Sequence, residues 1–381
     1  MKSGPLHNSQ HKSVNGRTVV AIDARKYFDY GIGTYIQNLI EGLGRLKSSY
    51  DFLAYVAVED DPRVSVPGTW RKSVVDYPKY SIQETFLFSA KSKKDRVNVF
   101  HSPHYTLPYG LKMPSIVTIH DLIPLRFPEY FNALQRTYAR AMMSHAISRS
   151  RCVLVDSEFT KRDISSFFRV NENKIVVAHL GVGPEFKNVS SSQKLESFRE
   201  RFFLKNPFIL FVGNTKPHKG LHHLLSAFAL LKPRDLDLAI IGGSLSQDAA
   251  LGAAVRGLGL SGKVKELGRV NNEDLVLAYN AAEALVLPSL YEGFGLPAIE
   301  AMACKTPVVV SDGGALREIV DDAAIIVERG NINQLHDALQ QVLKDSRLRS
   351  SLVAKGGKNA KRFLWSKTAK KVLSAYESAL K

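Results

Sequence analysis

Two glutamates, Glu292 and Glu300, flank a glycine-rich stretch in the second half of the chain. Gly293 and Gly295 let the backbone approach a ligand closely, and the helix predicted to follow offers free N–H groups to a phosphate or hydroxyl oxygen. Carboxylates accept hydrogen bonds from sugar hydroxyls. The pattern therefore indicates a site for a polyhydroxy ligand, with a surface loop of solvated glutamates as the alternative. A strand predicted just before the loop, at Ala284–Leu287, favours the site.

Lys219 stands beside Gly220, between a strand predicted at Phe208–Val212 and a helix predicted at Gly220–Leu231. A cation at a helix start adds charge where backbone N–H groups already favour anions. We therefore expect Lys219 to bind a phosphate group. The alternative is a solvated surface lysine.

His120 ends the apolar strand predicted at Ser115–His120, and Asp121 follows it. A strand-end histidine usually has a structural role, but the carboxyl edge of a parallel sheet is where α/β proteins bind ligands. We expect His120 to lie at that edge, with Asp121 either orienting the ring or capping the turn. Gly31 and Gly33 form a second glycine pair, after the first predicted strand, which by itself is also typical of an ordinary turn.

Short β-branched runs alternate with turn residues and helical stretches along the chain, which is typical of parallel α/β sheets. We predict two doubly wound, Rossmann-like domains whose carboxyl edges face one another across a cleft. The predicted parts are an N-terminal domain (1–188, with a polar tail at 1–17), a linker (189–206), a C-terminal domain (207–363) and a final helix (364–381) that can cross back to the first domain.

Composition excludes several classes of protein. The 381 residues are 45% hydrophobic and 23% charged, which excludes a disordered chain. The two cysteines cannot form a disulfide framework or a cysteine-rich zinc module. The net charge of +16 favours anionic partners. Because no secretory signal and no apolar run of about 18 residues is present, we expect a cytoplasmic protein whose only membrane contact is peripheral.

The seven-residue gap between Glu292 and Glu300 resembles the signature of retaining glycosyltransferases of family 4, which have the GT-B fold. The resemblance extends over nearly the whole chain through an ordered set of motifs: Gly31–Thr34, Thr118–Asp121, Asp156–Thr160, His179–Gly183, Phe211–Gly220, Leu267–Val270, and Pro307–Asp312 with Glu318. Members of the family move a sugar from a nucleotide sugar to an acceptor with retention of configuration. The branch with Pro217-His218-Lys219 resembles bacterial mannosyltransferases of surface-polysaccharide assembly.

The resemblance implies a role for each matching residue. Glu300 would accept hydrogen bonds from the ribose hydroxyls, and the catalytic groups would be His120, Glu292 and Lys219. The donor site would comprise Gly31, Gly33, Asn214, Lys219, Arg269, Val270, Glu292, Gly293, Phe294, Gly295, Leu296 and Glu300. Within it, Lys219 would pair with the diphosphate. Glu318 is left outside the site, because a helix-surface role is sufficient for it.

Asn214 departs from the family pattern, because many members carry arginine there. A neutral amide cannot replace a guanidinium against a diphosphate, so Lys216 and His218 are the candidates for a second cation. No metal and no cofactor are expected. The only Asp-x-Asp triplet, Asp235–Asp237, reads as an ordinary loop before a strand. With no convincing carboxylate nucleophile, the resemblance favours front-face substitution, in which the leaving diphosphate accepts the proton of the acceptor.

The expected donor is GDP-mannose, and the expected acceptor is a glycan carried on a lipid diphosphate. Phe86–Phe88 adjoin the cations Lys91, Lys93, Lys94 and Arg96. Aromatic and basic residues together suit an anionic membrane surface. The alternative is a core-packed helix followed by solvated charges.

Two other classes of function fit parts of the sequence. A nucleotide-sugar epimerase uses the same two-domain scaffold, and detection of sugar transfer would separate the two. A basic nucleic-acid-binding protein fits the charge, but the chain has no recognisable binding module and no dense basic stripe with stacking aromatics. Nucleic acid is therefore not an expected partner.

Overall fold

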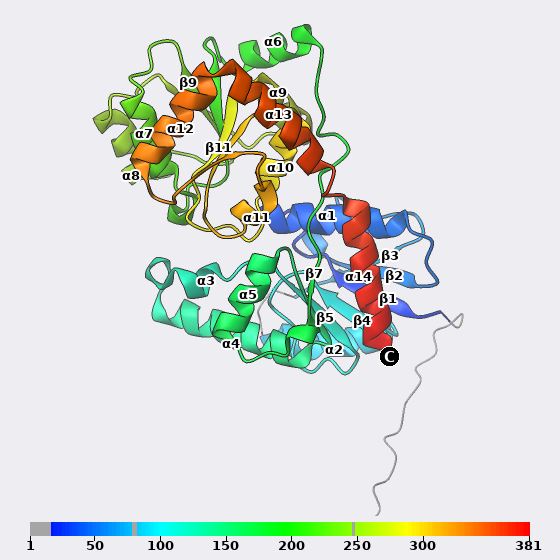
Figure 1. Ribbon diagram of the computed structural model, residues 1–381. Helices are drawn as coiled ribbons and strands as arrows, with labels where there is room; N and C mark the ends of the chain where they lie inside the picture. The colour runs from blue at the N-terminus through cyan, green and yellow to red at the C-terminus, as the bar shows by residue number, and fades with distance from the viewer. Residues whose placement is uncertain (1–16, 78–81, 246–247) are drawn as a thin grey trace, which may run out of the picture. The chain divides into compact units, whose positions relative to one another are not determined.

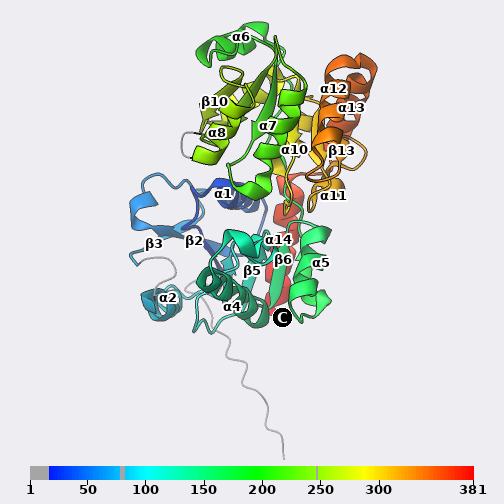
Figure 2. The same ribbon diagram turned by 90° about the vertical axis from the view of Figure 1, so that its left-hand side faces the viewer.

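The computed structural model describes residues 17–77, 82–245 and 248–381, and in it the chain forms two compact units (Figure 1). The first unit contains the residues up to Asp156, Lys161–Ala178 and Ser366–Lys381, and the second contains Ser157–Thr160 and His179–Trp365. Each unit is a parallel sheet with helices on both faces (Figures 1 and 2). The predicted α/β class with two Rossmann-like domains is confirmed. The polar tail lies outside the described residues, apart from Arg17.

The first unit has a seven-stranded sheet in the order β3-β2-β1-β4-β5-β6-β7, with every pair parallel. The strands are β1 (Val19–Asp23), β2 (Asp51–Ala57), β3 (Arg71–Val75), β4 (Val99–Ser102), β5 (Ser115–Ile119), β6 (Cys152–Val155) and β7 (Ile175–Val177). The α-helices that belong wholly or mostly to it are α1 (Tyr30–Gly44), α2 (Ile82–Lys94), α3 (Ile123–Arg126), α4 (Ala133–Arg149), α5 (Glu158–Phe167) and α14 (Trp365–Leu380). The direction of strand order reverses between β1 and β4.

The second unit has a six-stranded parallel sheet in the order β10-β9-β8-β11-β12-β13. The strands are β8 (Phe208–Val212), β9 (Asp237–Ile241), β10 (Val264–Gly268), β11 (Ala284–Leu287), β12 (Val308–Ser311) and β13 (Ile325–Val327). The α-helices are α6 (Ser192–Arg201), α7 (Leu221–Leu230), α8 (Ala249–Gly257), α9 (Asn272–Ala281), α10 (Leu296–Ala303), α11 (Leu316–Val320), α12 (Ile332–Lys344) and α13 (Ser346–Ala360). Here strand order reverses between β8 and β11.

The central strands are buried on both faces, which explains why the sequence shows continuous apolar runs rather than alternation. Every residue of β11 is at most 2% exposed, and all three residues Val153–Val155 of β6 are fully buried. β-Branched and leucine side chains suit such strands because they pack well on a pleated surface. The core of each unit therefore lies between its sheet and its helices, and the sheet edges are left to hold a site.

The final helix, α14, runs beside the strands of the first unit (red in Figures 1 and 2). Its Tyr376 is fully buried, and the Tyr376 hydroxyl lies 2.7 Å from Nδ1 of His101 on β4. Nε2 of His101 lies 2.8 Å from Oγ1 of Thr118, which in turn contacts the hydroxyl of Tyr35 at 3.0 Å. Burial lowers the pKa of His101 to about 3, so its ring is neutral. This chain of hydrogen bonds fixes α14 to the sheet.

The described elements that were not predicted from the sequence include β3, α8 and the four-residue helix α3. β3 is an edge strand whose first four residues are not buried, so it lacks an apolar pattern. α8 is rich in alanine and glycine and buries only Leu251 fully, which left no periodic signal. The sequence predicts a loop at Gly31 and Gly33 with a helix from Thr34, but helix α1 begins at Tyr30, so both glycines lie in its first turn.

The proposed membrane segment is partly contradicted by the position of Phe88. This side chain is fully buried, with its ring 4.8 Å from that of Tyr55 and 5.2 Å from that of Phe100. Phe88 therefore belongs to the core and cannot enter a membrane interface. The side chain of Phe86 lies outside the described residues. Leu87, by contrast, is 49% exposed.

Candidate active site

The loops that follow β8 and β11 lie together, because these two strands are neighbours at the point where strand order reverses. Helices leave such neighbouring strands toward opposite faces of the sheet, which opens a crevice at their carboxyl ends. The N–H of Leu290 donates to the carbonyl of His218 at 2.7 Å and ties one loop to the other. Gly220 adopts a left-handed conformation with φ of 69°, and a Cβ there would lie 2.1 Å from the carbonyl oxygen of Pro288. Only glycine permits this approach.

Lys219 and Glu292, one from each loop, form an ion pair. The Lys219 ammonium donates to both carboxylate oxygens of Glu292, at 2.8 and 2.9 Å. The fully buried Ser289 donates from its hydroxyl to Oε1 of the same carboxylate at 2.8 Å. The side chains of the pair are 22% and 14% exposed. Two residues predicted to belong to one donor site therefore hold each other, within reach of solvent.

The glycine loop before α10 packs against the doublet Gly313–Gly314, which the sequence analysis missed. Gly295 caps α10 with φ of 104°, where a Cβ would lie 2.6 Å from the side chain of Leu316. Gly314 has φ of 71°, and a Cβ there would lie 2.5 Å from the backbone N of Glu292. The N–H of Ala315 also donates to the carbonyl of Glu292 at 2.9 Å. The Gly-Gly doublet after β12 was the available sequence signal, because doublets of this kind permit positive φ.

Glu300 lies one turn into α10 and is only 7% exposed. The hydroxyl of Tyr279, on α9, donates to its Oε2 at 2.8 Å. Burial raises the pKa of Glu300 to about 7, although the hydrogen bond from Tyr279 acts in the opposite direction. A carboxylate that titrates near neutrality inside a folded domain is typical of a functional position.

The loop after β8 corrects one expectation about a second cation. His218 is 3% exposed, and burial together with the charge of Lys219 lowers its pKa to about 4. His218 is therefore neutral in this structure, which favours Lys216 as the second cation. The side chain of Lys216 is exposed. Its backbone N–H donates to Oδ1 of Asn214 at 3.1 Å, so the side-chain amide of Asn214 stabilises the turn.

The remaining predicted donor residues of the second unit divide into two groups. Phe294 is 4% exposed, and its ring lies edge-on to Phe363 with centroids 5.6 Å apart, so its side chain packs in the protein. Leu296 is half-buried at the first position of α10, after the turn at Gly293. Arg269 and Val270, in contrast, follow β10, which β9 separates from β8 in the sheet. They lie at the same sheet edge but away from the strand reversal.

His120 lies at the carboxyl edge of the first sheet, in the loop after β5. Its Nδ1 is 2.7 Å from Oδ2 of Asp156, and its Nε2 is 3.1 Å from the carbonyl oxygen of Pro103. Both ring nitrogens therefore face acceptors, which requires two N–H donors. Burial alone would lower the pKa of His120, but the charge of Asp156, with contributions from Asp121 and Pro103, raises it above its ordinary value. The two acceptors and the charge of Asp156 therefore favour the doubly protonated ring over a ring with a bare nitrogen.

The two predicted glycines of the first unit differ in importance. A Cβ at Gly33 would lie 2.5 Å from the carbonyl oxygen of Tyr27, so only glycine fits there. A Cβ at Gly31 would meet nothing within 4 Å. The first turn of α1 is therefore packed closely at Gly33 and open at Gly31.

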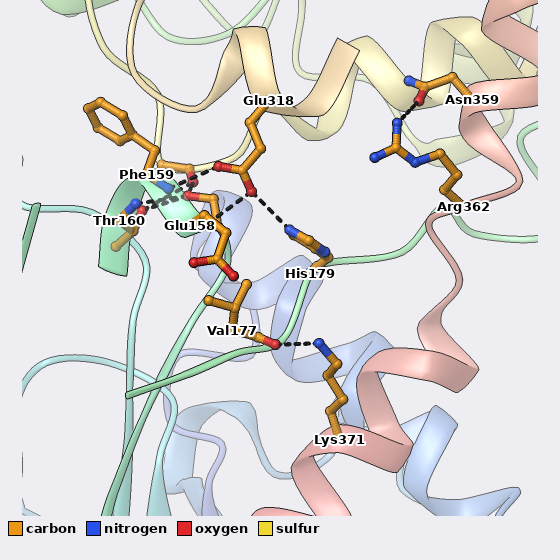
Figure 3. A network of polar contacts seen from close by, with 11 residues as sticks. Glu158, Phe159, Thr160, Val177, His179, Glu318, Asn359, Arg362 and Lys371 are labelled. Atoms are coloured by element: carbon orange, nitrogen blue, oxygen red, sulfur yellow. Dashed lines mark hydrogen bonds and ion pairs between the residues drawn. The ribbon is translucent and has the colours of Figure 1, made fainter. Parts of the chain in front are cut away.

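Glu318, which the sequence analysis left outside the site, organises a polar network in the second unit (Figure 3). Its carboxylate accepts from the backbone N–H groups of Glu158 and Phe159, both at 2.9 Å, and from Nε2 of His179 at 2.9 Å. Burial would raise the pKa of Glu318, but these hydrogen bonds outweigh it and lower the pKa. The hydroxyl of Ser157 also donates to the carbonyl of Gly293 at 2.8 Å. The network joins the first turn of α5 to the glycine loop.

Within residues 17–77, 82–245 and 248–381, no group of three or more histidine, cysteine, aspartate or glutamate side chains is arranged to hold a metal ion. In the same described residues, no helix is long and apolar enough to cross a membrane.

Two protein-family models match the chain. Glycosyltransferase Family 4 matches residues 30–186, and Glycosyl transferases group 1 matches residues 192–362. The matches fall on the two halves predicted from the motifs and together take in most of the chain. The chain belongs to the glycosyltransferases with these two domains and the GT-B fold, as the resemblance implied.

Individual relatives agree with this assignment. The chain is 29% identical over 282 residues to O-antigen chain mannosyltransferase B of Escherichia coli, covering 73% of this chain and 74% of that protein. It is 32% identical over 248 residues to O-antigen chain mannosyltransferase RfbU of Salmonella typhimurium, covering 62% and 65%. The structure of Anabaena HepE in complex with UDP-glucose has the same fold, with a TM-score of 0.77 at 17% identity over 95% of this chain and 99% of that chain.

We predict that Asp156→Asn lowers the pKa of His120 below that of the wild-type protein, because burial then dominates. Nitrogen-15 NMR should show that wild-type His120 keeps both ring nitrogens protonated to a higher pH than the variant does. Because the folded pKa is raised, the stabilisation from this pair is present below about pH 6.5 and is lost as the pH rises through the folded value.

The matched control is Asp337→Asn, which removes a carboxylate 3.0 Å from a different histidine, His336. It should leave the titration of His120 unchanged. An Asp156→Asn variant in which His120 titrates at the wild-type pH or above it would contradict the role of Asp156.

Proposed function

We propose that this glycosyltransferase is a retaining enzyme that moves mannose from GDP-mannose to a glycan acceptor in polysaccharide assembly. The observation that carries the proposal is the set of Lys219, Glu292 and Glu300 around the strand reversal of the second sheet. The names of the two O-antigen mannosyltransferase relatives support mannose and polysaccharide. The UDP-glucose bound to HepE supports a nucleotide-sugar donor.

In this proposal the donor replaces one partner of an existing ion pair. The diphosphate competes with the Glu292 carboxylate for the Lys219 ammonium, which is partly exposed. Glu292, still held by Ser289, then accepts hydrogen bonds from sugar hydroxyls. Oε2 of Glu300 accepts from the Tyr279 hydroxyl, and Oε1 accepts hydrogen bonds from the ribose hydroxyls. Each charge keeps a partner throughout, which avoids leaving an isolated buried ion.

The proposed chemistry is front-face substitution. The bond from the anomeric carbon to the diphosphate oxygen breaks, a bond to the acceptor oxygen forms on the same face, and the departing diphosphate takes the acceptor's proton. Lys219 stabilises the charge that develops on the leaving group. The contacts of His120 with Asp156 and Pro103 favour its protonated form, so no proton abstraction is assigned to this residue.

We predict that Glu300→Ala weakens GDP-mannose binding by roughly ten- to a hundredfold, because it removes charge-assisted hydrogen bonds worth about 1.5–3 kcal/mol. Lys219→Ala should weaken binding of GDP-mannose far more than binding of guanosine, because guanosine carries no phosphate. Isothermal titration calorimetry measures both. The control is Glu196→Ala, which removes an exposed glutamate on α6 and should change neither affinity.

Unchanged GDP-mannose affinity in folded Glu300→Ala would refute the role of this glutamate. Equal losses for GDP-mannose and guanosine in Lys219→Ala would refute the diphosphate contact. Product analysis with a glycan acceptor separates sugar transfer from isomerisation by an epimerase.

We also propose that transfer needs no metal ion, because Lys219 and the N-terminus of α7 supply positive charge at the diphosphate. Activity should therefore persist when EDTA is added to protein purified without metal. Sugar transfer is the measurement. Loss of activity in EDTA, with recovery in Mg²⁺ or Mn²⁺, would overturn this part of the proposal.

The acceptor is proposed to be lipid-linked, with the protein bound peripherally at the inner face of the cell membrane. Phe88 is not available for this contact, so the proposal now depends on the cations at the end of α2. Lys93, Lys94 and Arg96 are exposed, whereas Lys91 is half-buried and lies 3.9 Å from Asp95. The first three are the cations expected to meet acidic headgroups.

Replacing Lys93, Lys94 and Arg96 by serine should weaken binding to phosphatidylserine vesicles, because each cation contributes about 1 kcal/mol at an anionic surface. The loss should shrink as salt is added. Vesicle sedimentation measures it. The charge-matched control replaces the exposed lysines Lys344, Lys358 and Lys361 of the second unit and should bind like the parent. Equal binding by both triple variants would remove this support for a membrane contact.

A further inference from the structure

Tyr279 and Glu300 form a buried pair between α9 and α10. Tyr279 is fully buried, Glu300 is 7% exposed, and the tyrosine hydroxyl donates to Oε2 of the glutamate at 2.8 Å. Burial raises the pKa of Tyr279 well above its ordinary value. The hydroxyl therefore stays protonated and remains a donor throughout the range in which Glu300 titrates.

We propose that Tyr279 is a positioning residue that holds one oxygen of Glu300 and stabilises its ionised form, so that the other oxygen can accept from the ribose of the donor. The inference rests on the proposed function, because it takes the ribose contact of Glu300 as given. It goes beyond that function by naming the residue that controls the contact and by making donor binding depend on pH near neutrality.

The surroundings of Glu300 leave Tyr279 as its main stabilising partner. Burial raises the pKa of Glu300, Tyr279 lowers it, and the negative charge of Glu185 raises it, with a final value of about 7. Oε1 of Glu185 is held by the amide of Asn272 at 3.2 Å. Cys304, whose pKa is raised to about 12, is a neutral thiol.

The helix packed most extensively against α10 adds no charge at the contact. On α13, Gly356 lies against Met302, with an added Cβ 3.0 Å from its side chain, and the amide of Asn359 donates to the sulfur of Met302 at 3.4 Å. Neither residue can titrate. Among the described residues, the charge of Glu300 is therefore governed by burial, Tyr279 and Glu185.

The two ribose hydroxyls can each donate a hydrogen bond, so the protonation state of Glu300 affects how well it binds them. An ionised carboxylate offers only acceptors to the two ribose hydroxyls, whereas a protonated one must place its own proton. Donor affinity should therefore be full well above pH 7 and should fall as the pH drops through about 7. Without the Tyr279 hydroxyl, the ionised form loses its hydrogen bond and the midpoint moves to higher pH.

The test is calorimetric titration of the full chain with GDP-mannose and with UDP-glucose between pH 5.5 and about 8.8, a range in which both diphosphates stay ionised. In Tyr279→Phe we expect the midpoint of the affinity profile to rise by about one pH unit, which lowers affinity at pH 7 by about fivefold. Affinity at the high end of the range should return to within about twofold of wild type. A role in packing alone would weaken binding equally at every pH.

Two variants act as matched controls. Tyr376→Phe removes an equally buried, hydrogen-bonded hydroxyl from the first unit and should leave the midpoint where it is. Glu185→Gln removes the neighbouring negative charge and should move the midpoint to lower pH. If Tyr279→Phe does not fold, 3,5-difluorotyrosine at position 279 is the substitute. It keeps the shape of tyrosine and is a stronger hydrogen-bond donor to Glu300, so it should lower the midpoint, as Glu185→Gln does.

The outcomes separate this inference from the proposed function. If Glu300→Gln binds both nucleotide sugars like wild type at every pH, or if wild-type protein binds neither, the proposed function fails and the inference fails with it. If Glu300→Gln weakens binding and flattens the profile while Tyr279→Phe leaves the midpoint unchanged, the ribose contact stands and the role of Tyr279 is refuted.

Discussion

The reversal of strand order in each parallel sheet is the constraint on which the rest of the structure depends. Parallel strands need crossover helices, and the crossovers from neighbouring strands on the two sides of the reversal leave toward opposite faces. In the second unit this separates the loops after β8 and β11 while keeping them close enough for Leu290 to bond His218. Lys219 and Glu292 meet there, although 73 positions separate them in the chain.

Three glycines allow the backbone to pass through this crowded edge. Gly220, Gly295 and Gly314 all have positive φ, and a side chain at each would meet backbone or packed side-chain atoms. The apolar strands supply the rigidity beneath them, since β11 is buried along its whole length. Rigid strands with closely packed glycine loops at their ends hold polar groups in fixed positions, which is what recognition of a charged, hydroxyl-rich ligand requires.

The polar groups at the two sheet edges are tuned by their neighbours rather than by exposure. Asp156 and Pro103 favour the protonated form of His120. Burial raises the pKa of Glu300 to about 7, and Tyr279 limits that rise. Burial and Lys219 keep His218 neutral. The pKa of each residue is moved from the value of its type, because a buried site weights desolvation and single hydrogen bonds heavily.

The sequence by itself determined the α/β class, most strands, the glycine loops and the family, because apolar runs, turn residues and ordered motifs are local signals. It also identified Lys219, Glu292, Glu300 and His120 as polar residues in loop or helix-start positions. Tertiary structure alone decided which of them meet. The Lys219–Glu292 pair, the contact of Tyr279 with Glu300 and the network of Glu318 all join residues far apart in the chain. Phe88 reads as an interfacial aromatic from its neighbours but lies in the core, since burial depends on packing between elements and not on local composition.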